Sequence, residues 1–151
     1  MAASRSLPTL PRPKPLRPVP PAVTCCAIGN PERAVNGYLG DCWASKVADD
    51  QWISVDLENI HEIARILLLW GNYPTHFKIR VSTDGKVWRT VAENLRSTKV
   101  ESGEINDQHD ISFSPAIKAR HVRLELTKRA NAEFGYALHE FLILDSTKKR
   151  P

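Results

Sequence analysis

Proton-transfer chemistry in this chain would fall first to its five histidines, which are His61, His76, His109, His121 and His139. None of them lies in an HExxH motif or beside a GxSxG turn, the spacings of metallopeptidase and serine-hydrolase sites. His109 precedes Asp110, but adjacent pairs of this kind arise by chance in polar stretches. The residues therefore predict a protein that is not an enzyme, and an enzyme of unrecognised type is the least favoured hypothesis.

The three cysteines, Cys25, Cys26 and Cys42, cannot all pair within one chain. They form no CxxC motif and have no histidine at the spacing of a zinc site. Reduced thiols in an intracellular protein are favoured. A bridge from Cys42 to Cys25 or Cys26 is the alternative.

The positive charge of the chain is concentrated at its two ends. The sequence holds 21 Lys and Arg against 17 Asp and Glu, a formal net charge of +4. Seven of the cations lie in residues 1–21 and 146–151, which contain no acid, so residues 22–145 hold 14 cations and 17 acids. A basic face for nucleic acid is therefore not expected on the folded domain.

Seven of the 11 prolines also fall within residues 1–21, so this tail is predicted to be disordered or to adopt polyproline II. Residues 12–18 fit Arg-x-x-Pro-x-x-Pro, a pattern that SH3-type partners bind. No apolar run is long enough for a signal peptide or a membrane span, which favours a cytoplasmic location. We expect a tail at 1–21, a domain at 22–145 and a basic tail at 146–151.

The domain sequence alternates in short stretches that are typical of strands. Strands are expected at 22–28, 51–57, 63–70, 77–81, 87–91, 110–113, 121–126 and 141–144. Asp84-Gly85 predicts a hairpin, and residues 31–35 predict one helical turn capped by Asn30. Without long helices to cross between parallel strands, the fold class is an all-β antiparallel β-sandwich.

The sequence also predicts which side chains of this fold are buried. The nearly continuous apolar run 63–70 is suited to a strand buried on both faces. Trp52, Trp70 and Trp88 are expected in the core, because large aromatic side chains dominate burial in small sandwiches, whereas Tyr136 is either a further ligand candidate or a core residue.

Several stretches of this sequence resemble, in order, the motifs of one known family. They are NPERAVNG (30–37), DCWAS (41–45), QWISVDL (51–57), FKIRVSTDG (77–85), ARHVRL (119–124) and GYALHEF (135–141). The family is that of the coagulation factor 5/8 C-terminal, or discoidin, domains, and the likeness is closest to its family 32 carbohydrate-binding modules. The resemblance implies a galactose-binding-like jelly-roll that binds ligands through loops at one end, without catalysis.

The resemblance also implies a structural calcium site. Its ligands would be Asn36, Asp41, Glu140 and the backbone carbonyls of residues 38–41. Asn36 stands where the family has Asp, which removes one negative charge from the site. Asp41 stands where the family has Ser or Thr, which restores one negative charge if its side chain points inward. The alternative is a plain tight turn, with Glu140 accepting backbone N–H groups.

Sugar sites combine an aromatic face with fixed polar groups. The candidates in the end loops are Tyr38, Asn72, Tyr73, His76, Asn131 and Phe134. Gly71 replaces the Glu of the family's WExAY pattern, and the Arg…Asn-Gly pair of galactose-binding members is absent, which counts against galactose.

Three binding functions are therefore compared. The first is carbohydrate recognition through the end loops. The alternative is an intracellular protein-interaction module that uses the same loops and the Pro-rich tail. The third is a phospholipid surface contacted by Tyr38, Leu39 and Phe134, which the acidic neighbours Asp41 and Glu133 oppose.

Overall fold

The computed structural model describes residues 30–146 and the backbone of residues 23–25. Residues 1–22, 26–29 and 147–151 lie outside the described residues, and with them the SH3-type motif at 12–18 and the thiol of Cys26. Cys42 forms no disulfide within the described part of the chain. Burial, followed by the nearby Glu104 carboxylate, raises the pKa of the Cys42 thiol.

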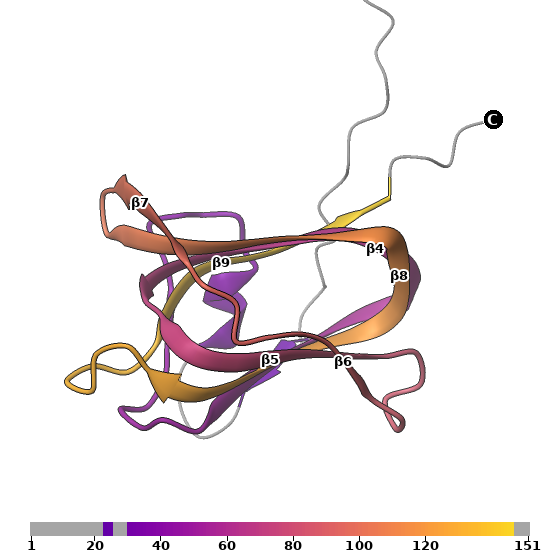
Figure 1. Ribbon diagram of the computed structural model, residues 1–151, viewed down its shortest axis with the longest axis horizontal. Helices are drawn as coiled ribbons and strands as arrows, with labels where there is room; N and C mark the ends of the chain where they lie inside the picture. Colours follow the sequence, from indigo (N-terminus) through magenta and orange to yellow (C-terminus); the bar gives the residue numbers. More distant parts are fainter. Residues whose placement is uncertain (1–22, 26–29, 147–151) are drawn as a thin grey trace, which may run out of the picture.

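Antiparallel strands make up nearly all of the regular structure (Figure 1). They are β2 (Val23–Cys25), β3 (Trp43–Ala44), β4 (Gln51–Asn72), β5 (Pro74–Ser82), β6 (Arg89–Glu93), β7 (Thr98–Ser102), β8 (Ile105–Arg129) and β9 (Ala137–Asp145). The hydrogen-bonded order is β3-β9-β4-β8-β5-β6, with β2 beside β4 and β7 beside β8. This arrangement confirms the predicted antiparallel β-sandwich.

Two long strands, β4 and β8, belong to both layers of the sandwich. Residues 51–56 of β4 pair with residues 121–126 of β8, and residues 63–70 pair with residues 107–117. Between these stretches the register shifts and Glu58 adopts a φ of 72°. Both strands therefore bend together and return beneath themselves, as Figure 1 shows at the edge where β4 and β8 are labelled. Each long strand was predicted as two short ones.

The core lies between the layers and is filled by alternate residues of the strands. Its largest fully buried side chains include Trp43, Trp70, Tyr136, Phe77 and Phe141. The expectation for Trp70 is therefore confirmed, and of the two readings of Tyr136 the structure shows the core residue.

Trp52 and Trp88 do not lie in the core, contrary to the expectation from their size. Trp52 is flanked by the buried residues Gln51 and Ile53, so the two-residue period of β4 turns its ring to the outer face. The guanidinium carbon of Arg123 lies 4.3 Å from the Trp52 ring centre and 5.9 Å from that of Trp88. Cation–π contact thus half-buries both rings outside the sandwich.

The apolar run 63–70 is buried on one face, and the prediction of burial on both was wrong. Ile66, Leu68 and Trp70 are buried, whereas Leu67 and Leu69 are half-exposed. An antiparallel layer of a two-layer sandwich has only one inward side, so even an unbroken apolar sequence divides into core and surface positions.

Two local expectations hold with changes. Pro31–Ala34 is a 3₁₀ helix that begins after Asn30, but Asn30 caps it through its carbonyl rather than its side chain. The hairpin at Asp84-Gly85 joins β5 to β6, with Gly85 at a φ of 80°.

No helix among the described residues is long and apolar enough to cross a bilayer.

The alternation of buried and outer positions within β4 predicts that truncating neighbouring leucines lowers the free energy of unfolding by unequal amounts. We expect Leu68→Ala, at a fully buried position, to lower the free energy of unfolding by about 2–5 kcal/mol. The matched Leu67→Ala, on the outer face, should lower it by roughly 1 kcal/mol or less. Urea denaturation followed by tryptophan fluorescence measures both values, and equal losses would contradict the one-sided burial of this strand.

Candidate functional site

The connections between β4 and β5 and between β6 and β7 face each other across a cavity of about 280 Å³. Residues 73–75 line one side and residues 94–97 line the other. The β4–β5 connection is a single residue, Tyr73, placed between Asn72 and Pro74. The cavity therefore lies at one end of the sandwich, where strand ends and not strand faces supply the lining.

The Tyr73 side of the cavity is anchored to β8. The carbonyl of Tyr73 accepts a 3.0 Å hydrogen bond from the backbone N–H of Ala130, immediately after β8. The Tyr73 side chain packs partly against the hydrophobic core while it also lines the cavity. Tyr73 is thus a lining residue that also rests on the core.

Asn94 holds the opposite loop to β5. Its Oδ1 accepts from the Phe77 N–H at 2.8 Å, and its own N–H donates to the Phe77 carbonyl at 2.8 Å. Asn94 has a φ of 50°, a left-handed conformation that Asn tolerates better than most residues. Its Nδ2 group has no hydrogen-bond partner among the described residues, so that donor remains for a ligand.

His109 fastens the middle of the same loop to the core. The indole N–H of Trp70 donates to Nδ1 of His109 at 3.0 Å, and Nε2 of His109 lies 3.0 Å from the Leu95 carbonyl. Because the indole nitrogen can only donate, Nδ1 must be the acceptor, and the ring proton sits on Nε2 and points at Leu95. The hydrogen-bond chain therefore requires a neutral imidazole.

The surroundings of His109 favour that neutral form. Only 1% of its surface is exposed, and the Phe77 ring centre lies 4.6 Å from its own. Burial lowers the pKa of His109, while the Leu95 carbonyl and the Asp107 carboxylate partly oppose this effect. Asp107 itself accepts from Ser97 Oγ at 3.1 Å, which fixes the end of the loop.

The arrangement is suited to binding and carries no catalytic pair. His109 and Asp110 are neighbours on a strand and point to opposite faces. His109 lies inside, whereas Asp110 forms a two-fold hydrogen-bonded ion pair with Arg65 on the outside, both bonds at 2.7 Å. The two side chains therefore belong to strand β8 and not to a polar loop, and they do not act together.

Of the six predicted ligand residues, only Tyr73 lines this cavity. Asn72 ends β4, and His76 lies on β5 with its Nδ1 3.0 Å from Thr75 Oγ1. Tyr38 is 65% exposed on the loop before β3, and Phe134 is 51% exposed on the β8–β9 loop. Asn131 caps a turn of that loop by accepting from the Glu133 N–H at 2.9 Å.

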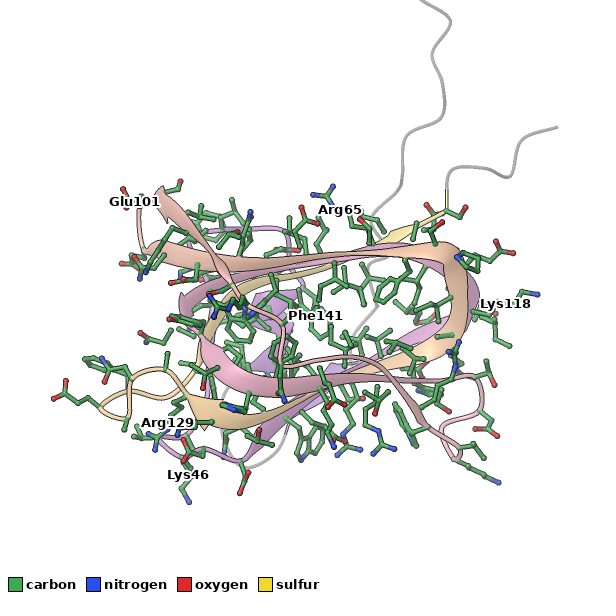
Figure 2. The ribbon with its side chains drawn as sticks, viewed as in Figure 1. Lys46, Arg65, Glu101, Lys118, Arg129 and Phe141 are labelled. Carbon is green, nitrogen blue, oxygen red and sulfur yellow. The ribbon has the colours of Figure 1, made fainter. Side chains whose placement is uncertain are left out.

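Arg129 shapes the β8–β9 loop, which starts beside Tyr73. Its guanidinium donates to Asp49 Oδ1 and to the Ala132 carbonyl, both at 2.9 Å. Figure 2 shows Arg129 and Lys46 at this end of the sandwich and Lys118 at the opposite end. Phe134 and Asn131 thus occupy a neighbouring loop, outside the cavity lining.

The sequence interpretation did not identify residues 94–97 as part of a candidate site. Their signal was modest: a polar stretch, Asn94 to Ser97, after the predicted strand at 87–91. What makes the stretch a cavity wall is its attachment to Phe77, His109 and Asp107. These three partners lie on other strands, so no local pattern identifies them.

Gly71 has a structural reason to depart from the family's Glu. A Cβ atom at this position would lie 3.2 Å from the Glu104 carbonyl and 3.2 Å from His139 Nε2. These distances are shorter than ordinary van der Waals contacts. A larger side chain at residue 71 would therefore require its neighbours to shift.

The predicted calcium turn closes through its own hydrogen bonds. Asn36 Nδ2 donates to Asp41 Oδ2 at 2.9 Å, while Asn36 Oδ1 accepts from the Tyr38 N–H at 2.9 Å. The Tyr38 carbonyl accepts from the Asp41 N–H at 3.1 Å, and the Leu39 carbonyl lies 2.9 Å from His139 Nδ1.

Asn36 does not fit a calcium ion in this arrangement. Its oxygen is engaged by the turn, and its amide donor faces the carboxylate that a cation would use. Glu140 is 3% exposed on β9. Among the described residues, no three His, Cys, Asp or Glu side chains cluster as metal ligands. Calcium binding therefore stays a prediction from the resemblance.

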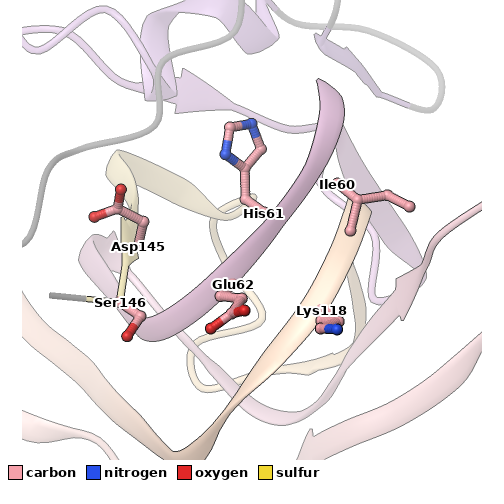
Figure 3. A pocket seen from close by; sticks show the side chains of 6 residues that line it. All are labelled: Ile60, His61, Glu62, Lys118, Asp145 and Ser146. Atoms are coloured by element: carbon pink, nitrogen blue, oxygen red, sulfur yellow. The ribbon is translucent and has the colours of Figure 1, made fainter. Parts of the chain in front are cut away.

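A larger hollow of about 340 Å³ lies at the bend of β4 (Figure 3). Its lining comprises Ile60, His61, Glu62, Lys118, Asp145 and Ser146. This lining contains no Phe, Tyr or Trp, and it mixes charges of both signs. We therefore place the candidate site at the loop end, where Tyr73 supplies an aromatic wall.

Comparison with known proteins relates this fold to other domains. The sequence matches the F5/8 type C domain over residues 23–141. No curated protein matches the chain.

Three solved structures illustrate the likeness. Chitosan-binding module 2 of a chitosanase/glucanase from Paenibacillus sp. IK-5, solved with chitotriose, is 31% identical with a TM-score of 0.70 over 81% of this chain and 94% of that chain. Chitosan-binding module 1 of the same enzyme is 31% identical with a TM-score of 0.67 over 80% and 92%. The family 32 module of NanJ from C. perfringens, solved with galactose, shares the fold at 20% identity, with a TM-score of 0.65 over 82% and 94%.

The neutral imidazole of His109 predicts a loss of stability in acid. Its pKa is lowered on folding, so below pH 6.5, the ordinary value, the unfolded chain binds a proton that the folded protein does not. The free energy of unfolding should fall from that pH until the lowered pKa is reached. In His109→Gln this part of the pH dependence should disappear, whereas His61→Gln at the β4 bend should keep it. Urea denaturation at a series of pH values measures the slopes, and identical slopes in all three proteins would contradict this role.

The hydrogen-bonded turn predicts what one added charge would do. Asn36→Asp replaces the amide donor with a carboxylate beside Asp41, and the two should then share a cation. We expect calcium to raise the melting temperature of Asn36→Asp by several degrees more than that of the native chain. Asn131→Asp, which adds the same charge to another turn, is the control. A calcium response no larger in Asn36→Asp than in the control would show that the turn cannot hold the ion.

Proposed function

Because this chain belongs to the F5/8 type C domain family, we propose that it is a carbohydrate-binding module that uses the cavity between residues 73–75 and 94–97. F5/8 type C domains and family 32 modules are non-catalytic binding modules, in agreement with the expectation that the chain is not an enzyme. The carrying observation is the phenol ring of Tyr73 in the wall of that cavity.

The chemistry of the lining supports a saccharide. The apolar side of a pyranose packs on an aromatic ring, and its hydroxyl groups need donors and acceptors in fixed positions. Tyr73 supplies the ring, and Asn94 supplies an amide whose orientation is set by Phe77. A cavity of about 280 Å³ has room for one or two sugar units.

The similar structures support the same class of ligand. Two of them are named as chitosan-binding modules at 31% identity, and one of these was solved with chitotriose. We therefore carry glycan binding to this chain as the proposal. Which sugar it prefers depends on the charges of its own lining.

Exposed apolar side chains favour a protein partner as the second candidate. Tyr38 is 65% exposed, Leu39 is 49% exposed and Phe134 is 51% exposed, all on loops. Large exposed side chains of this kind are enriched at protein interfaces. The same residues would serve for a phospholipid surface, but Asp41 and Glu133 stand beside them and would be repelled by anionic lipid.

Loss of the aromatic wall should weaken glycan binding. We expect Tyr73→Ala to lower the affinity for bound oligosaccharides about tenfold, because an aromatic contact contributes roughly 1 kcal/mol or more. Affinity electrophoresis in gels that contain glucan, chitin or uronan, followed by titration calorimetry with the retained sugar, measures the change. The variant is assayed well below its melting temperature, because Tyr73 also supports the core.

Phe134→Ala and Tyr38→Ala serve as comparisons on the other loops. Both should bind like the native chain if the cavity is the site. If no glycan is retained by the native chain, the carbohydrate proposal fails. If Phe134→Ala alone loses binding, the ligand occupies the β8–β9 loop and not the cavity.

A further inference from the structure

Arg96 is the one ionic side chain among the residues that line the cavity at 73–75 and 94–97. It is exposed, and its guanidinium forms no ion pair with any other described residue. Most arginines of this domain differ in that respect: Arg65, Arg120 and Arg129, for example, are paired with Asp110, Asp56 and Asp49. The cavity therefore carries an uncompensated positive charge at its lining.

The carboxylate that anchors this loop does not neutralise the charge. Asp107 has a side chain that is only 4% exposed, and it is engaged by Ser97 and by Lys99 Nζ at 3.5 Å. The cavity lining thus carries one positive charge and no negative one, although residues 22–145 as a whole are acidic.

We propose that this cavity prefers a saccharide unit that carries an anionic group, either a carboxylate or a sulfate ester. This inference rests on the proposed carbohydrate function and names its ligand class. The sugar ring lies against Tyr73, the anionic substituent pairs with the fork of Arg96, and a hydroxyl accepts from Asn94 Nδ2. A guanidinium matches the two oxygens of a carboxylate or sulfate better than any neutral donor.

The same charge discriminates against amino-sugar polymers. A protonated amine needs an acceptor, and a carboxylate is the strongest one that a protein offers. No Asp or Glu lines this cavity, and Arg96 would repel the amine. The ligand class therefore differs from that named for the chitosan-binding modules, despite 31% identity.

The test compares oligosaccharides of equal length that differ in charge. Titration calorimetry with the full chain uses oligogalacturonate, a sulfated oligosaccharide, neutral N-acetylated chitooligosaccharide and deacetylated chitooligosaccharide with its amines protonated. The variants are Arg96→Gln and Arg96→Glu. Lys86→Gln, on the β5–β6 hairpin at the other end of β5, makes the same change in net charge and is the matched control.

We expect an anionic oligosaccharide to bind the native chain about tenfold more tightly than the neutral one, and increasing salt to reduce the difference. Arg96→Gln should remove the preference, Arg96→Glu should reverse it toward the amino sugar, and Lys86→Gln should keep it. Whether the carboxylated or the sulfated sugar is bound identifies the anion. If the native chain binds the neutral or cationic sugar at least as tightly, or if Arg96→Gln keeps the preference, the inference is overturned while the carbohydrate function stands. If no saccharide binds, both are overturned.

Discussion

The pairing of β4 with β8 is the constraint on which the rest of this domain depends. Each strand crosses from one layer to the other, and both bend at the same place, so the two layers are joined by continuous backbone. β5 and β6 extend one layer from β8, and β9 extends the other from β4. The loops at the far end from the bend are brought together as a result. The cavity between Tyr73 and Asn94 is therefore a product of strand length and register rather than of any local motif.

Within that frame, His109 connects the core to the loop at 94–97. Its ring receives a hydrogen bond from the buried Trp70, which holds only while the imidazole is neutral, and its other nitrogen lies within hydrogen-bond distance of the Leu95 carbonyl. The hydrogen bond from Trp70 fixes the orientation of the imidazole ring, and the ring in turn fixes the position of the loop at Leu95. Hydrogen bonds from Asn94 to Phe77 and from Ser97 to Asp107 complete the attachment. The cavity wall is thereby preorganised, which reduces the entropy that a ligand would lose on binding.

Alternating residues made the fold class predictable, because side-chain direction in a strand has a period of two. The same rule explains the two burial errors: Trp52 and Leu67 are large and apolar, but each stands next to residues that already face inward. The bends of β4 and β8 were not predictable, since they arise from pairing partners distant in sequence. At the candidate site, Tyr73 was predicted from its type and its place in a recognised pattern, and the structure places it in the cavity lining. The loop at 94–97 was not predicted, because the contacts that make it a cavity wall are with Phe77, His109 and Asp107 on other strands.

Arg96 takes no part in holding the fold together, and this separation has an evolutionary consequence. The loop backbone is fixed by Asn94, Leu95 and Ser97, which leaves the side chain between them without a structural duty. Under the proposed function, mutations at residue 96 would alter which ligand is recognised while the domain continues to fold as before. On that proposal, a single substitution at residue 96 would change the preferred ligand during evolution, and no compensating substitution in the core would be needed first.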